Sequence, residues 1–153
     1  MASDRLSLII FLGVTALIPE MVRAGRNLTV LRDSSYPPEY LVNLVKNSLD
    51  KCHSETDIEE SVISRFRDDE DDEGTPKLGC YLFCIFNSSE FWMNDRDELD
   101  IMKILDIIPK SFETHALKMG LRCLKVKGND KCERSLWYHN CWKKTDPEHY
   151  FLM

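Results

Sequence analysis

The chain has 153 residues and a net charge of −6, from 26 Asp and Glu against 20 Lys and Arg. This acidic balance provides no attraction to a phosphate backbone, so a nucleic-acid partner is not expected. The length is that of one domain, and six cysteines in so short a chain are typical of a secreted protein held by disulfides.

The N-terminus has the pattern of a secretory signal peptide. Asp4 and Arg5 precede an apolar run over 6–18, and Val22-Arg23-Ala24 places apolar or small residues before a cleavage site. The apolar run is too short to span a membrane, and no second run offers an anchor. We therefore predict a signal peptide over 1–24 and one secreted domain over 25–153.

Two triplets match the acceptor pattern for N-linked glycans. They are Asn27-Leu28-Thr29 and Asn87-Ser88-Ser89. Because such triplets are often unused, Asn27 and Asn87 are candidate sites whose occupancy is left open.

The first two helices are predicted from proline placement and apolar spacing. The string YPPE at 36–39 suits the start of a helix, which then runs to about Lys51. Thr56 and Glu59 form a capping-box pattern, and Ile58, Val62 and Phe66 follow at four-residue spacing in a short amphipathic second helix. The six acids at 68–73 lack the alternating ligands and central glycine of a calcium loop, so they predict a solvated linker.

A third helix over 76–87 forms the centre of the predicted fold. It carries Cys80 and Cys84 one turn apart on the same face, with Cβ atoms about 5–6 Å apart, whereas a disulfide needs about 3.5–4.5 Å. The two cysteines should therefore bond to other segments of the chain and not to each other.

Three more helices complete the predicted set. Asn94 is the candidate cap of a fourth helix, which ends before Pro109, and Ser111 is the candidate cap of a fifth. The apolar residues of these two helices follow helical spacing and should face each other: Ile101, Ile104, Leu105 and Ile108, then Phe112, Ala116 and Met119. A sixth helix begins at Asp130 and places His139 and Trp142 one turn apart. With no period-two segment and no internal repeat, the class is all-α.

Six cysteines allow fifteen pairings, and geometry alone leaves ten of them open. The spacing itself is more specific: 27, 3, 38, 8 and 8 residues separate successive cysteines. Together with the strings YPPE, CYLFCIF, MGLRC and CWKKTDPEHYFLM, it resembles the insect odorant-binding proteins of the pheromone and general odorant-binding family. The resemblance covers Tyr36 to Met153.

The resemblance implies a compact six-helix bundle with a hydrophobic cavity. It also implies that the helices are linked by the disulfides Cys52–Cys84, Cys80–Cys132 and Cys123–Cys141. It implies a secreted carrier, without a cofactor, that takes small hydrophobic odorants or pheromones through sensillar lymph to olfactory receptors. Helical spacing supplies the candidate lining, which also has an ordinary reading as core: Ile101, Ile104, Ile108, Phe112, Ala116, Met119, His139 and Trp142.

The C-terminal string HYFLM is expected to fold over the bundle, as the resemblance implies. Tyr150, Phe151 and Leu152 would form a wall of the cavity, and the Met153 carboxylate would accept a hydrogen bond from a nearby polar group such as Tyr81. Acidification, by charging His139 or His149 and neutralising carboxylates, would then loosen this lid and release ligand.

Other classes of function fit the sequence less well. A secreted hydrolase needs a histidine–aspartate pair beside a glycine-rich calcium loop, and a structural zinc site needs paired ligands at short spacing, so neither an enzyme nor a metal site is predicted. The open alternative is a secreted protein that sequesters hydrophobic or amine ligands outside olfaction. A homodimer is compatible with an apolar bundle, although no patch in the sequence requires one.

Overall fold

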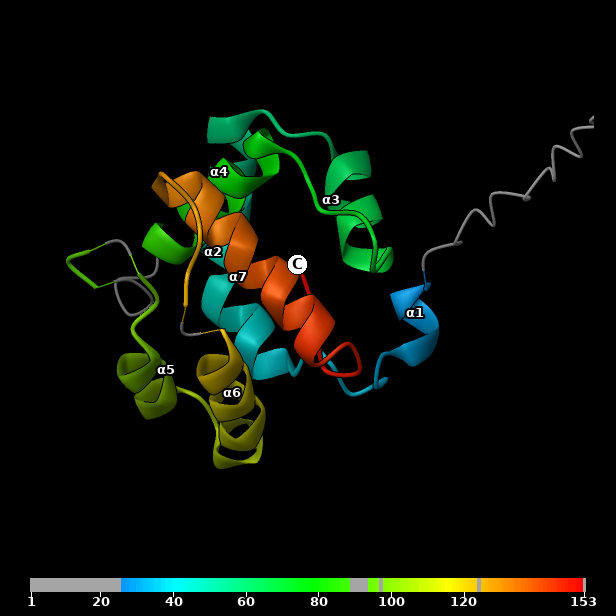
Figure 1. Ribbon diagram of the computed structural model, residues 1–153, viewed down its shortest axis with the longest axis vertical. Coiled ribbons are helices and arrows are strands. Elements are labelled where there is room, and N and C mark those ends of the chain that lie inside the picture. Colours follow the sequence, from blue (N-terminus) through cyan, green and yellow to red (C-terminus); the bar gives the residue numbers. More distant parts are fainter. Residues whose placement is uncertain (1–25, 89–93, 97, 124, 153) are drawn as a thin grey trace, which may run out of the picture.

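The computed structural model describes residues 26–88, 94–96, 98–123 and 125–152, and this part of the chain is helical without a strand. Its seven helices are α1 (Leu28–Leu31), α2 (Glu39–Thr56), α3 (Glu60–Asp68), α4 (Pro76–Ser88), α5 (Ile101–Ile107), α6 (Lys110–Arg122) and α7 (Lys131–Thr145) (Figure 1). The all-α class is confirmed. The six predicted helices are present, and the short α1, which buries Leu28 completely, was not predicted.

Helix α4 is the central element, as its sequence indicates. It packs against both α2 and α7, and it buries the side chains of Leu78, Tyr81 and Leu82. Its glycine allows the approach to α7, because a Cβ added at Gly79 would lie 2.5 Å from the carbonyl oxygen of Cys132. In Figure 1, α1 and α3 lie on one side of α7, and α5 and α6 lie on the other.

Three disulfides fix this arrangement. Cys52–Cys84 joins α2 to α4, Cys80–Cys132 joins α4 to the start of α7, and Cys123–Cys141 joins the end of α6 to α7. These are the three pairs that the family resemblance implies. Cys80 and Cys84 bond to different helices, in agreement with their placement on one face of α4.

The buried side chains form two clusters with Trp142 packed against both. The larger cluster fills the space between α2, α3, α4 and the C-terminal segment around Phe66, Leu82 and Tyr150. In the second cluster Ile104 and Ile108 meet Phe112 and Ala116, so the two predicted apolar stripes do face each other.

The capping-box prediction is wrong. Helix α2 continues to Thr56, whose hydroxyl donates to the carbonyl of Cys52 at 2.7 Å instead of capping the next helix. Asp57, with φ of 48°, ends α2 in the left-handed conformation, and α3 starts only at Glu60. A threonine hydroxyl that bonds backward within its own helix is unavailable as a cap for the next one.

The two other predicted caps are also wrong. Asp100, not Asn94, caps α5 by accepting from the Lys103 N–H at 3.2 Å, while Asn94 closes a turn before the helix. Helix α6 begins directly after Pro109, so Ser111 lies inside it. The prediction that the sixth helix begins at Asp130 is confirmed, because Asp130 is the N-cap of α7 and accepts from the Glu133 N–H at 2.9 Å.

The acidic segment 68–73 is not simply a solvated linker. The ammonium group of Lys143, a fully buried residue of α7, donates to the backbone carbonyls of Phe66, Asp69 and Asp72 at 3.0, 2.9 and 2.5 Å. It also lies 3.8 Å from the centre of the Phe66 ring. The backbone of this segment is therefore docked on α7, while Asp71 and Glu73 are exposed.

Among the helices that the structure describes, none is both long and apolar enough to cross a bilayer.

Candidate functional site

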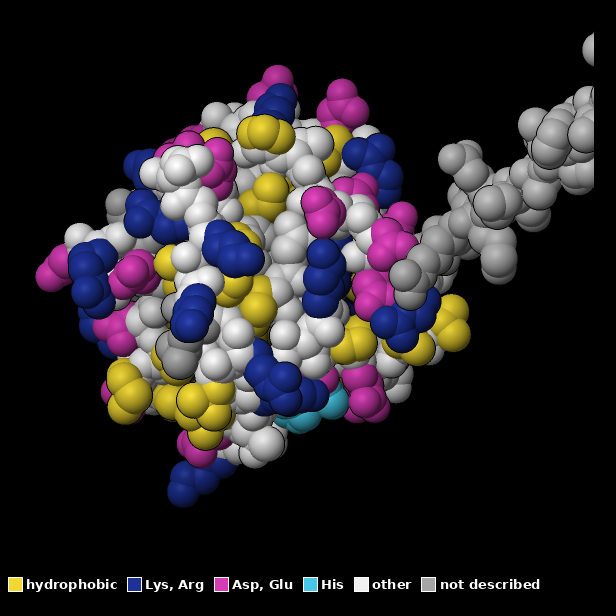
Figure 2. Space-filling view, in the orientation of Figure 1, with side chains coloured by type: hydrophobic (Ala, Val, Ile, Leu, Met, Phe, Trp, Pro, Cys, Tyr) yellow, Lys and Arg dark blue, Asp and Glu magenta, His cyan; other side chains and the backbone are white. Residues whose placement is uncertain are grey.

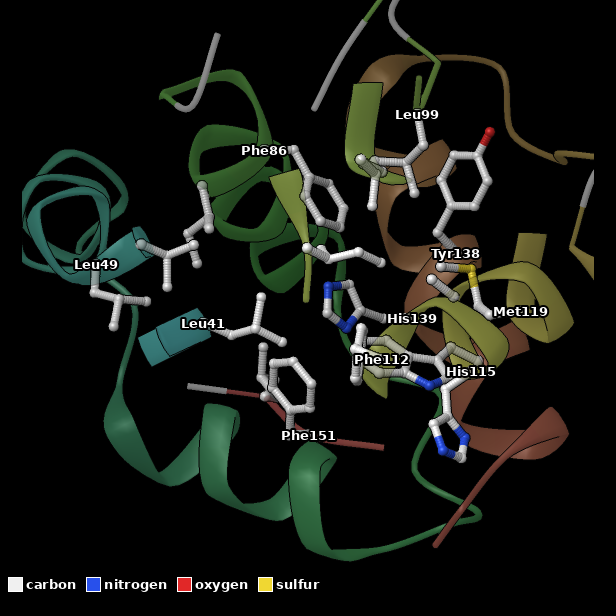
Figure 3. A pocket seen from close by; sticks show the side chains of 17 residues that line it. Leu41, Leu49, Phe86, Leu99, Phe112, His115, Met119, Tyr138, His139 and Phe151 are labelled. Carbon is white, nitrogen blue, oxygen red and sulfur yellow. The ribbon is translucent and has the colours of Figure 1, made fainter. Parts of the chain in front are cut away.

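An apolar cavity lies where the two core clusters meet. Its volume is about 90 Å³, room for several water molecules at roughly 10–15 Å³ each. The walls come from α2, α4, the segment before α5, α5, α6, α7 and the C-terminal segment (Figure 3). They consist of Leu41, Val45, Leu49, Ile85, Phe86, Leu99, Ile104, Ile108, Phe112, His115, Ala116, Met119, Tyr138, His139, Trp142, Phe151 and Leu152.

The structure brings nine of the eleven predicted ligand-binding residues together around this cavity. They are Ile104, Ile108, Phe112, Ala116, Met119, His139, Trp142, Phe151 and Leu152. Ile101 is not among the lining residues, because the first turn of α5 places it against Gly120 of α6, 3.2 Å from where a Cβ would stand. Tyr150 is fully buried in the larger cluster behind the wall.

The residues that sequence reasoning missed come mainly from α2 and α4. Leu41 and Val45 lie four residues apart on one face of α2, but such spacing does not distinguish a side chain that fills the core from one that borders a cavity. The same ambiguity holds for Phe86 in the apolar sequence of α4. Nothing in the sequence singled out His115 or Tyr138.

His139 lies at the centre of the lining and is nearly inaccessible to water (Figure 3). Its ring stacks on Phe86 with centroids 5.3 Å apart, and its Nδ1 is 3.4 Å from the Tyr150 hydroxyl. Burial, together with the positive charge of Lys143, lowers the pKa of His139 to about 3. The imidazole is therefore neutral at pH 5, and the expectation that mild acid charges His139 is wrong.

The C-terminal segment forms one wall. The Phe151 ring lies 4.8 Å from Trp142 and 6.2 Å from Phe112, measured between centroids. Two backbone contacts hold the segment: Arg32 Nε donates to the Tyr150 carbonyl at 3.0 Å, and the Asp33 N–H donates to the Glu148 carbonyl at 2.8 Å.

The expected bond between Met153 and Tyr81 stays a prediction, because Met153 lies outside the described residues. Tyr81 is buried, and that burial, with smaller contributions from the charges of Glu60 and Asp50, raises its pKa to about 12. The hydroxyl is consequently protonated and able to donate at any physiological pH.

The two candidate glycosylation sites differ in their surroundings. Asn27 is exposed and caps α1 by accepting from the Thr29 N–H at 2.9 Å, whereas Asn87 is exposed in the last turn of α4. The exposed position of Asn87 would point a glycan away from the helix packing. The predicted signal peptide, residues 1–24, lies outside the described residues.

Comparison with known proteins gives one family match and several similar folds. The model of the PBP/GOBP family matches residues 37–145. Odorant-binding protein 4 of the predator Chrysopa pallens is 22% identical, with a TM-score of 0.60 over 74% of this chain and 95% of its own. A medfly odorant-binding protein is 20% identical, with a TM-score of 0.58 over 67% and 88%. A fatty acid binding protein from the oral disk of the blowfly Phormia regina is 21% identical, with a TM-score of 0.53 over 71% and 93%.

Proposed function

Because the chain belongs to the PBP/GOBP family, we propose that it is a secreted carrier that holds a small hydrophobic molecule in the cavity described above. The observation that carries the proposal is the position of this cavity, enclosed by aliphatic and aromatic side chains between the two core clusters. The ligands would be odorants or pheromones, which the protein would carry through sensillar lymph to olfactory receptors.

The energetics of such a cavity suit reversible binding. Burying 200–300 Å² of apolar ligand surface yields about 5–7.5 kcal/mol at roughly 25 cal/mol per Å², before the loss of ligand freedom. Because a Kd of 1 μM corresponds to about 8.2 kcal/mol, this contribution limits the affinity to the micromolar range or weaker. A ligand of this area is larger than the present cavity, so side chains must move apart on binding, and the flexible thioether of Met119 suits that adjustment.

The polar groups of the cavity favour neutral ligands. None of the described lining residues is an aspartate or glutamate, so a protonated amine would lose its hydration without gaining a counter-ion. Neutral His139 and the Trp142 indole instead suit one hydroxyl, carbonyl or ester oxygen. Of the two ligand classes in the alternative prediction, hydrophobic or amine, this chemistry supports the hydrophobic one.

The test is displacement of N-phenyl-1-naphthylamine from purified, oxidised protein by alcohols, aldehydes and esters, with a primary amine of matched chain length as the control. We expect micromolar displacement by the neutral compounds and at least tenfold weaker displacement by the amine at pH 7. If neither the probe nor any neutral compound binds, the carrier proposal is wrong.

Release by acid is tested in the same assay at pH 5. Because His139 remains neutral there, a fall in affinity must come from other groups, either His115 in the lining or those of the C-terminal segment. Deleting residues 150–153 should remove any difference between the two pH values. If the truncated protein keeps that difference, the C-terminal segment is not a pH-operated lid.

A carrier outside olfaction is the second candidate. It is favoured by the similarity to the fatty acid binding protein from the blowfly oral disk. Two measurements distinguish olfactory transport from a carrier role outside olfaction. Fatty acids are added to the displacement panel, and tissues are stained with an antibody to the protein. Antennal staining would support olfactory transport, and staining confined to other tissues would support the second candidate.

An exposed apolar surface on α5 and α6 is a candidate contact face for a homodimer. Met102 on α5 and Leu117 and Leu121 on α6 are exposed, and hydrophobic side chains gather over these helices in the space-filling view (Figure 2). Light scattering of the wild type and of Leu121→Lys measures whether the chain pairs and whether this face is used.

A further inference from the structure

Two histidines and a buried aspartate meet where α7 passes into the C-terminal segment. His115 comes from α6, Asp146 ends α7, and His149 lies in the following turn. His115 Nδ1 is 3.2 Å from one carboxylate oxygen of Asp146, and His149 Nδ1 is 2.9 Å from the other. One ligand atom from each of the three residues lies within 4.8 Å of the other two.

The local fold holds these groups in place without a bound ion. The Asp146 N–H donates to the Trp142 carbonyl, and the His149 N–H donates to the Asp146 carbonyl, so the turn keeps aspartate and histidine on one side. The rings of His115 and His149 lie 3.7 Å apart between centroids, and Tyr36 packs against both. The site is therefore built from three segments before any ligand arrives.

We propose that His115, Asp146 and His149 bind one divalent transition-metal ion, with Zn²⁺ as the favoured ion. Zinc takes imidazole nitrogen and carboxylate oxygen at about 2.0–2.2 Å, which in a tetrahedron places ligand atoms about 3.4 Å apart. The three ligand atoms all lie within 4.8 Å of one another, so they must move closer together by up to about 1.4 Å to reach that spacing. Two imidazoles and one carboxylate leave the fourth position to water, whereas Ca²⁺ and Mg²⁺ prefer an all-oxygen set.

Access and charge both suit an ion arriving from solvent. The His115 and His149 side chains are 25% and 16% exposed, so their nitrogens are reachable, while the Asp146 side chain is only 4% exposed. Nitrogen atoms of His115, Lys118 and His149 lie 3.2, 3.2 and 2.9 Å from the oxygens of the Asp146 carboxylate. The carboxylate therefore already faces three nitrogen groups at contact distance.

Lys118 is the competitor for this carboxylate. Its ammonium nitrogen lies 3.2 Å from the Asp146 oxygen that also faces His149. A metal ion must displace that contact, and Lys118 is half exposed and free to swing into water. Removing the lysine charge should therefore strengthen metal binding, which an ordinary structural role for the cluster would not predict.

The test is isothermal titration of EDTA-treated, untagged protein with ZnCl₂ at pH 7.5, together with the visible spectrum of the Co²⁺ form. We expect one ion per chain, with affinity at least tenfold weaker in His115→Gln and in His149→Gln and several-fold tighter in Lys118→Met. His53→Gln, a substitution of an exposed histidine on α2, is the matched control and should leave affinity unchanged.

Either of two results would overturn the proposal. One is the absence of saturable binding up to 1 mM Zn²⁺ and of a Co²⁺ ligand-field spectrum, and the other is unchanged binding in the His115→Gln/His149→Gln double variant. Circular dichroism in EDTA identifies any variant that fails to fold. If a histidine variant fails to fold, tighter Zn²⁺ binding by Lys118→Met supports the proposal, and unchanged binding by Lys118→Met contradicts it. Binding of the apolar probe is measured in EDTA, so the carrier function and the metal site are judged separately.

Discussion

The protonation of one buried histidine shapes both the cavity and the stability of the protein in acid. None of the described residues that line the cavity with His139 carries a carboxylate, and the hydroxyl of Tyr150 lies 3.4 Å from its Nδ1. Burial favours its neutral form, as it favours the neutral form of the Tyr150 phenol, whose pKa burial raises. A hydroxyl that donates to Nδ1 leaves the imidazole proton on Nε2.

This protonation state predicts how stability depends on pH. The pKa of His139 is about 3 when folded and near 6.5 when unfolded, so between these values the unfolded chain binds a proton that the folded chain lacks. The free energy of unfolding should therefore fall as pH drops from 6.5 toward 3, by up to about 1.4 kcal/mol per pH unit from this group. Urea unfolding of the wild type and of His139→Gln measures it, and equal slopes for the two would contradict the assignment.

A second residue-scale prediction concerns the space beside α6. Ala116 is buried against the cavity, and Ala116→Leu would place three additional carbon atoms in that space. We expect the affinity for N-phenyl-1-naphthylamine to fall at least tenfold, with a stability cost of no more than about 1–3 kcal/mol from overpacking.

The matched control is Thr114→Leu, which adds bulk at an exposed position of the same helix. Its probe affinity should equal that of the wild type. If Ala116→Leu also binds the probe normally, the ligand occupies a different site.

At the scale of elements, the most unexpected contact is the one between α7 and the acidic segment before α4. Lys143→Met keeps an apolar side chain over the Phe66 ring but leaves three backbone carbonyls without their donor. We expect a loss of about 2–4 kcal/mol in the free energy of unfolding, since each unsatisfied buried group costs roughly 1–3 kcal/mol and water reaches some of them.

The neighbouring lysine provides the control. Lys144 is half exposed, and among the described residues its ammonium group pairs with the exposed Glu73 carboxylate at 3.4 Å. Lys144→Met should change stability by no more than about 0.5 kcal/mol. Equal losses in the two variants by urea unfolding would mean that the buried ammonium group does not anchor the segment.

The boundaries of a helix were predictable where a single local sequence signal marked them. Pro76 before a continuous apolar stretch predicted α4 to within a residue, and Asp130 marked the start of α7. Caps failed where two polar residues competed: Asn94 and Asp100 both suit the start of α5, and only packing decides where the chain turns. The docking of segment 68–73 needed a lysine more than seventy residues away, which no local pattern indicates.

The lining of the cavity was likewise predictable where local spacing specified it. The stripes of α5 and α6 bury one face each, so spacing identified the residues that meet there. His115 was missed because its environment arises only when the C-terminal turn reaches α6. Helix geometry left ten sets of disulfide pairs open. The family resemblance of the cysteine spacing selected one of the ten.

At the scale of the whole molecule, the disulfides should differ in their contribution to stability. Cys80–Cys132 spans 52 residues and Cys123–Cys141 spans 18, so in the chain-entropy picture the longer loop stabilises by about 1 kcal/mol more. Urea unfolding of Cys80→Ser/Cys132→Ser and of Cys123→Ser/Cys141→Ser should show that order, within losses of about 2–5 kcal/mol. The reverse order would mean that strain or residual structure outweighs loop entropy.

Helix α5 differs from the other helices around the cavity in having no covalent tie. Disulfides hold α2, α4, the end of α6 and α7, whereas α5 packs against α6 through apolar side chains and accepts a hydrogen bond at its Ile107 carbonyl from the Tyr40 hydroxyl of α2. Ile104 and Ile108 consequently belong to the most compliant wall. The tolerance of the protein for longer molecules should therefore be governed by how far this one short helix yields, and affinity should decline gradually with chain length without a sharp cut-off.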